Sequence, residues 1–105
     1  MIISVALLVA GAVSVRAADA KENWDAKCKV CHGADGKGQT KMGQKAGAKD
    51  YTDPKVQEGM KDDEMAKAIK EGVKDGQKTK MKAFGDVLSD DEIKALVKHV
   101  RDFKK

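Results

Sequence analysis

The pentapeptide Cys28-Lys29-Val30-Cys31-His32 contains both cysteines of the chain and one of its two histidines. A C-x-x-C pair has several uses in proteins. A zinc site needs four ligands, usually from a second cysteine or histidine pair, and this chain has no second pair. A redox-active dithiol of the thioredoxin type is expected near a βαβ unit, and the sequence has no pattern of strands. The histidine after the second cysteine therefore decides between the alternatives.

His32 completes the C-x-x-C-H signature of covalent c-type haem attachment. Two cysteines on adjacent helical turns can reach the two vinyl groups on one side of the porphyrin and form thioethers. The imidazole of the next residue then points at the iron. We therefore expect Cys28 and Cys31 to bind the porphyrin and His32 to be the proximal iron ligand, with haem favoured over zinc or a dithiol.

The first twenty residues differ in composition from the rest of the chain. Residues 2–15 are almost purely apolar, and charges become frequent from Arg16 onward. The run is shorter than the about 20 apolar residues of a membrane span. It is typical of a secretory signal peptide, with an A-x-A cleavage site ending at Ala20. We expect residues 1–20 to be a signal peptide, cleaved after Ala20 or near Ala17/Ala18, and the protein to be periplasmic; an uncleaved leader that anchors it to the membrane is the alternative.

Residues 21–105 then form one small domain that is poor in large apolar side chains. The chain has one Trp, one Tyr and two Phe. A core of this kind alone gives a small domain little stability, so such domains often contain a disulfide, a metal or a cofactor. A disulfide between cysteines three positions apart would close a very small loop and add little stability. A large apolar cofactor would supply the missing core.

Apolar periodicity predicts three main helices. The first covers residues 20–31, where Trp24, Cys28 and Cys31 share one face. The second begins near Asp62, with acidic residues in its first turn and an apolar face behind them.

The third predicted helix begins with a capping box formed by Ser89 and Glu92.

Between residues 33 and 59, glycines interrupt any periodicity, as expected of a loop wrapped around a ligand. Asp53-Pro54 predicts a turn or the start of a short helical piece within this segment. No segment alternates like a strand. We therefore expect an all-α protein.

Two segments resemble parts of a known family. WDAKCKVCHGADGKG (residues 24–38) resembles the first helix, haem motif and glycine loop of small soluble monohaem cytochromes c of class I, and KTKMKAFGDVLSDDEIKALVKHVRDF (78–103) resembles their methionine loop and closing helix. The similarity covers nearly all of residues 21–105. It implies the cytochrome c fold, in which three main helices and glycine-rich loops surround one covalently attached haem c with its iron. By position, it implies His32 as the proximal ligand and Met81 as the distal ligand.

The distal ligand can also be considered without the family. Met65 lies on the apolar face of the second helix, where packing is expected. Met60 precedes that helix and is expected to pack or to be exposed. Met42 is tethered closely to the haem motif, which hinders its approach to the opposite face of the ring. His99 lies at the edge of the apolar face of the third helix, as a partly buried surface histidine would. Met81, in an irregular stretch between helices, is free to reach the iron.

Ligation by histidine and methionine predicts a function. With both axial positions filled, the iron has no open site for a substrate, and the thioether favours Fe(II). We expect a soluble one-electron carrier, not an enzyme, that shuttles electrons between redox partners in a respiratory or photosynthetic-type chain. The alternatives are a haem enzyme or sensor with an open distal site, similar to small peroxidases, and a haem subunit of a membrane complex.

The formal net charge of +4 favours acidic redox partners. Aromatic residues are too few to favour nucleic-acid binding. We expect a monomer that meets membranes only through partner complexes. The lysines that could surround an exposed haem edge are Lys37, Lys41, Lys45, Lys49, Lys74, Lys78, Lys80 and Lys82.

Overall fold

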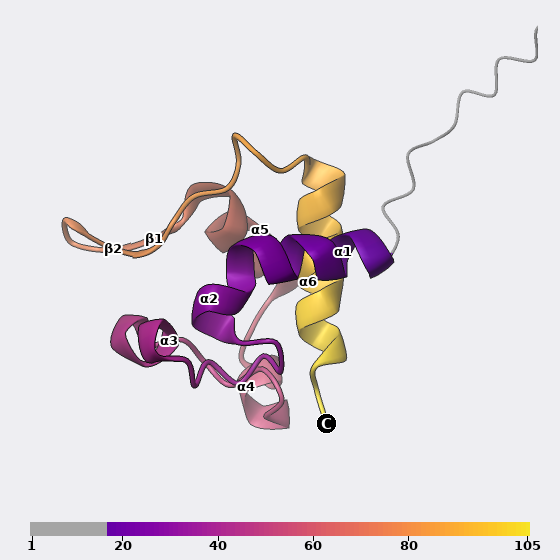
Figure 1. Ribbon diagram of the computed structural model, residues 1–105, viewed down its shortest axis with the longest axis horizontal. Helices are drawn as coiled ribbons and strands as arrows, with labels where there is room; N and C mark the ends of the chain where they lie inside the picture. The colour runs from indigo at the N-terminus through magenta and orange to yellow at the C-terminus, as the bar shows by residue number, and fades with distance from the viewer. Residues whose placement is uncertain (1–16) are drawn as a thin grey trace, which may run out of the picture.

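The computed structural model describes residues 17–105 (Figure 1). Residues 1–16, which make up most of the predicted signal peptide, lie outside this range. Within the described part of the chain, no helix is both long and apolar enough to cross a membrane. Most of the regular structure is helical, with one two-stranded sheet.

The first predicted helix is present as three consecutive helical pieces. They are α1 (Ala17–Asn23), a π-helical turn η1 (Trp24–Cys28) and α2 (Lys29–His32). The N–H of Lys29 donates to the carbonyl of Trp24, which is the wider spacing of a π turn. Single π turns inside α-helices are frequent at functional sites. Here the turn contains Cys28 of the cysteine motif.

The segment expected to be a loop contains two short helices, α3 (Lys41–Ala46) and α4 (Pro54–Glu58). Each begins at a side-chain cap: the Thr40 side chain accepts from the Gly43 N–H, and the Asp53 side chain accepts from the Lys55 N–H. The short helical piece predicted at Asp53-Pro54 is therefore confirmed as α4. The helix α3 was not predicted, because it is too short to have an apolar period of its own.

The second and third predicted helices are α5 (Asp62–Glu71) and α6 (Asp90–Asp102). The α5 helix starts at the expected residue. The α6 helix begins with the predicted capping box, in which the Ser89 hydroxyl accepts from the Glu92 N–H and the Glu92 carboxylate accepts from the Ser89 N–H. Both expectations are confirmed.

The expectation that no strand would form was wrong. Strands β1 (Val73–Asp75) and β2 (Lys78–Met81) pair as an antiparallel hairpin, in which Val73 lies opposite Met81. Gly76, with a φ of +61°, forms the turn. All of β1 and the first half of β2 are exposed, while Met81, at the end of β2, packs against the core as a half-buried residue. The alternation of apolar and polar residues that identifies most strands was therefore missing from the sequence.

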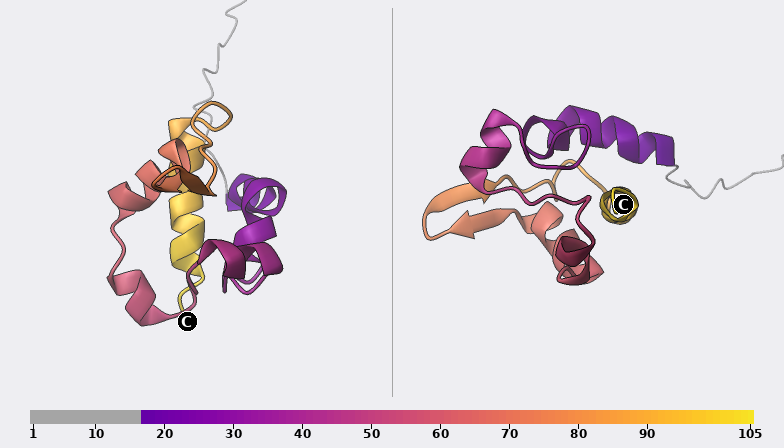
Figure 2. Two further views of the ribbon diagram at one scale, coloured as in Figure 1. Left: turned by 90° about the vertical axis from the view of Figure 1, so that its left-hand side faces the viewer. Right: turned by 90° about the horizontal axis from the view of Figure 1, so that it is seen from below.

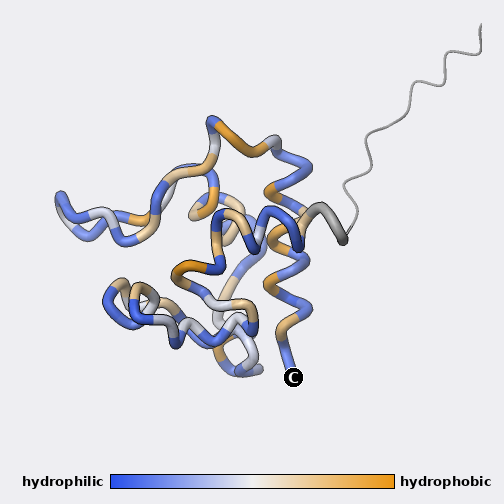
Figure 3. The backbone as a smooth tube through the Cα atoms, viewed as in Figure 1, coloured by the Kyte–Doolittle hydropathy of each residue, from blue (hydrophilic) through white to orange (hydrophobic). Residues whose placement is uncertain are grey.

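The core lies between α6 and the elements on either side of it. Figure 2 shows α6 between α5 and the consecutive helices α1, η1 and α2, and both α1 and α5 contact α6. Along α6, hydrophobic and hydrophilic residues alternate with helical spacing, whereas the hairpin tip is hydrophilic (Figure 3). The buried core cluster consists of Trp24, Cys28, Ile69, Leu88, Ile93, Leu96, Val97 and Val100.

Candidate haem site

A cavity of about 460 Å³ opens beside the cysteine motif, within the range of ligand pockets, about 300–1,000 Å³. Its wall is mainly apolar. Its lining comes from η1, α2 and the residues after α3 and, later in the chain, from α5, the hairpin and the residues that follow it. The lining includes Cys28, Cys31, His32, Tyr51, Met60, Met65, Met81 and Phe84.

The two cysteines are not joined by a disulfide. Cys28 is buried and Cys31 is half-buried, and both lie on the cavity wall. Burial raises the pKa of the Cys28 thiol to about 11. A thiol with this pKa holds its proton at neutral pH, whereas a redox-active dithiol needs a thiolate. Cys28 is therefore not suited to be the attacking thiolate of such a dithiol.

His32 ends α2, and Gly33, with a φ of +78°, stops the helix directly after it. The imidazole lies between the rings of Trp24 and Tyr51, at centroid distances of 5.4 and 5.3 Å. Its Nδ1 is buried without a hydrogen-bond partner. Burial lowers the pKa of His32, which favours the neutral imidazole that binds metals.

These features fit a c-type haem. Two cysteine sulfurs and a neutral imidazole are grouped on one side of a mainly apolar cavity of suitable size. Such an environment accommodates a large apolar ring that carries a metal. Cys28 and Cys31 would hold the porphyrin through thioethers, and His32 would bind the iron.

Met81 ends β2 and lines the same cavity as the cysteine motif. Met60 and Met65 also line the cavity and pack against the core cluster. Packing was the expectation for Met65, and it was one of the two alternatives for Met60. Met42 is 53% exposed and does not line the cavity. His99 is also absent from the wall; it packs instead on Trp24. The fold thus places Met81 on the wall of the cavity beside the haem motif and leaves Met42 and His99 off that wall.

Two residues that sequence reasoning missed hold the haem motif in place. The Thr40 hydroxyl lies 2.8 Å from the carbonyl oxygens of both Val30 and Cys31. Gly43 packs so closely on α2 that a Cβ there would come within 2.0 Å of the Cys31 carbonyl oxygen. No pattern marked either residue, because their contacts depend on how α3 folds back onto α2.

The edge of the cavity is predominantly positive. Four lysines contribute to its lining, together with one acidic residue, Glu64. They come from η1, from the segment after α3, and from β2 and the residue that follows Met81. We refer to them as the mouth lysines: Lys27, Lys49, Lys80 and Lys82.

Comparisons with known proteins agree with this site. The family model "Cytochrome C oxidase, cbb3-type, subunit III" matches residues 15–100. A solved structure of the KustC0563 c-type cytochrome is 35% identical, with a TM-score of 0.73, over 82% of this chain and 98% of its own. A tyrosine-to-phenylalanine mutant of Kustc0563 is also 35% identical, with a TM-score of 0.71, over 82% of this chain and 99% of its own. The search of curated proteins gave no match.

The family match and the two solved structures confirm the predicted cytochrome c fold and the covalently bound haem with its iron. The hairpin and the short helices α3 and α4 are additions to the three predicted helices. The chain belongs to the c-type cytochrome family described by the cbb3-type oxidase subunit III model, and it is a small monohaem cytochrome c.

Proposed function

We propose that this cytochrome is a one-electron carrier, and not an enzyme, whose haem iron is bound by His32 and Met81. The supporting observation is that Cys28, Cys31, His32 and Met81 line one cavity, although Met81 is far from the haem motif in sequence. A methionine that arrives on a separate hairpin can approach the iron from the face opposite His32.

Two protein ligands explain why the chemistry would be electron transfer. The haem supplies an iron that cycles between Fe(II) and Fe(III). With an imidazole and a thioether as axial ligands, no position is open for a substrate, and the thioether raises the reduction potential. Tyr51, Phe84 and the apolar side chains of the wall would limit the access of water to a bound ring, which would also raise the potential.

Replacement of each cavity methionine by alanine tests the ligand assignment. Met81→Ala should abolish the weak sulfur–iron absorption band at the red end of the visible spectrum and lower the reduction potential. Met60→Ala and Met65→Ala are matched controls, because both residues line the same cavity, and each should retain the band. Carbon monoxide should bind readily only to reduced Met81→Ala. If the unaltered protein lacks the band, or binds carbon monoxide readily, the carrier proposal is wrong.

We further propose that the mouth lysines dock acidic redox partners. A positive rim around the cavity would increase the association rate with such partners, and salt would weaken the effect. Lys80→Glu and Lys82→Glu should slow electron transfer to an acidic partner protein at low ionic strength, and the difference should shrink in high salt. Lys94→Glu, on the exposed side of α6, makes the same charge change away from the cavity and should have little effect. Equal slowing by all three variants would contradict docking at the mouth.

A haem subunit of a membrane complex is the second candidate, and the description of the matching family fits it. It would require the apolar leader to remain attached, whereas a periplasmic carrier would lose it. We propose export with cleavage after Ala20 or near Ala17/Ala18. N-terminal sequencing of the protein from fractionated cells distinguishes the two: an intact leader in the membrane fraction would support the subunit, and a cleaved chain in the periplasm the carrier.

A further inference from the structure

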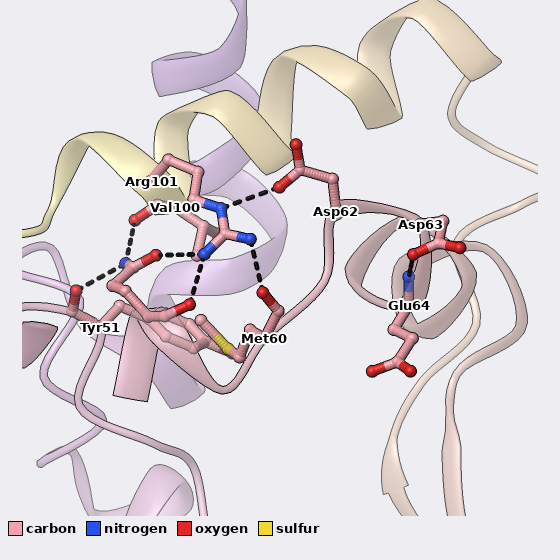
Figure 4. Close-up of polar contacts among 8 residues, drawn as sticks. Tyr51, Met60, Asp62, Asp63, Glu64, Val100 and Arg101 are labelled. Atoms are coloured by element: carbon pink, nitrogen blue, oxygen red, sulfur yellow. Dashed lines mark hydrogen bonds and ion pairs between the residues drawn. The ribbon is translucent and has the colours of Figure 1, made fainter. Parts of the chain in front are cut away.

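Arg101, in the last turn of α6, extends its guanidinium group to the segment that connects α4 and α5 (Figure 4). Its Nη1 donates to the carbonyl of Gln57 at 2.7 Å, and its Nη2 donates to the carbonyl of Met60 at 2.7 Å. Its Nε donates to the carboxylate of Asp62 at 2.8 Å. One planar group therefore holds three successive parts of the segment from Gln57 to Asp62.

Gln57 is hydrogen-bonded to Arg101, and we refer to these two residues with their hydrogen-bond partners as the Arg101 cluster. The Gln57 side chain is only 3% exposed. Its Oε1 accepts from Arg101 Nη1 at 3.0 Å. Its Nε2 donates to the carbonyl of Tyr51 at 2.7 Å and to the carbonyl of Val100 at 2.8 Å. Every polar atom of this buried amide has a partner, which makes the arrangement specific, because any displacement leaves a buried group unsatisfied.

Two of the four carbonyls held by this cluster, those of Tyr51 and Met60, belong to residues of the haem cavity. Tyr51 and Met60 both line the cavity wall, and neither is fully buried. Between residues 51 and 61, Gln57 is the single buried residue. Tyr51 and Met60 pack against the core cluster only as half-buried side chains. Hydrogen bonds from Arg101 and Gln57 add a second connection, to α6, which belongs to the core.

We propose that Arg101, acting through Gln57, is the positioning residue of this cavity wall. It would hold Tyr51 and Met60 against the haem and keep water away from that side of the ring. Lower access of water disfavours the more highly charged Fe(III) state and keeps the reduction potential high. The proposal does not depend on which methionine binds the iron.

The positive charge of Arg101 could also act on the iron directly, and substitution by lysine separates the two effects. Arg101→Lys keeps the charge but loses the planar fork that reaches Gln57 and Met60 together. Arg101→Gln loses both. Asp62→Asn is the matched control, because Asp62 is 72% exposed and contacts only the Nε side of the guanidinium.

The experiment measures the reduction potential and amide hydrogen exchange of the haem-loaded protein. Arg101→Lys and Arg101→Gln should both lower the potential, and exchange of the amides from Gln57 to Met60 should accelerate by about tenfold or more, while the amides of Ile93 to Val97 exchange as before. Asp62→Asn should behave like the unaltered protein.

Three results would overturn the proposal. An unchanged potential in both Arg101 variants would show that the cluster does not influence the haem. A potential retained in Arg101→Lys but lowered in Arg101→Gln would assign the effect to charge. Equal acceleration of exchange throughout α6 would indicate general destabilisation. If Arg101→Lys does not fold, Gln57→Met, which loses the donors to Tyr51 and Val100 without adding a charge, gives the test of positioning: the potential should fall and exchange from Gln57 to Met60 should accelerate.

Discussion

The indole ring of Trp24 packs against the imidazole of His32, with 5.4 Å between the ring centroids. The indole Nε1 also donates to the carbonyl of Gly33 at 2.8 Å. Trp24 is 2% exposed, and its ring contacts His99 and Phe103 of the C-terminal region as well. One side chain thus connects the proposed iron ligand to the core around α6.

Replacement of Trp24 should separate its hydrogen bond from its packing. Trp24→Phe keeps an aromatic ring but leaves the Gly33 carbonyl without its donor, so we expect a loss of about 1–3 kcal/mol in the free energy of unfolding. Trp24→Ala also creates a cavity and should cost about 3–5 kcal/mol. Denaturant unfolding of the haem-loaded protein measures both. Equal losses in the two variants would assign the contribution to the hydrogen bond and not to the ring.

Gly43→Ala should impair the haem motif, because the added Cβ would come within 2.0 Å of the Cys31 carbonyl oxygen. Backbone atoms cannot move aside as a flexible side chain can. We expect a loss of at least about 1–3 kcal/mol in the free energy of unfolding and a lower yield of haem-loaded protein.

Gly59→Ala is the matched control for this substitution. Its Cβ would meet only ordinary contacts, the nearest at 3.7 Å, and its φ of −79° suits any residue. It should not lower the free energy of unfolding; because Gly59 itself lines the cavity, it is a control for stability and not for haem loading. Normal haem loading in Gly43→Ala would show that α3 can move away from α2 without harm to the motif.

Those parts of the fold that depend on local patterns could be predicted from the sequence. Ser89 and Glu92 mark the start of α6 because a capping box is formed by neighbours in sequence. Cys28, Cys31 and His32 mark the predicted haem site because the C-x-x-C-H spacing suits attachment to a porphyrin, and all three line the cavity. Met81 lies on the cavity wall, as its predicted role requires, although it ends strand β2 and is not in the irregular stretch that was expected.

The contacts that complete the site depend on tertiary structure and had no local signal. Gln57 reads as an ordinary polar residue, yet it is buried because Arg101, which is 44 positions further along the chain, supplies its partner. The hairpin was missed for a related reason: its strands are exposed and its role is to carry Met81 to the cavity. Side chains that serve a cofactor need not follow the periodicity of the protein core.

His99 should make the stability of the protein depend on pH below 6.5. Burial lowers the pKa of His99 from its ordinary value of 6.5, although the nearby carboxylates of Asp102 and Asp25 oppose the shift; Lys21 adds to it. Between the folded and unfolded pKa values, the unfolded chain binds more protons. Stability from this residue is therefore fully present above pH 6.5 and is lost as the pH falls through the folded pKa.

His99→Gln should flatten the pH dependence of the unfolding free energy in the window just below pH 6.5, because glutamine does not titrate. Asp102→Asn should extend the loss to lower pH, since it removes a carboxylate that raises the pKa of His99. Both are measured by denaturant unfolding of the haem-loaded protein at a series of pH values. The iron-bound state proposed for His32 would prevent that imidazole from titrating over this range, so the slope can be attributed to His99. An identical slope in His99→Gln and the unaltered protein would contradict this attribution.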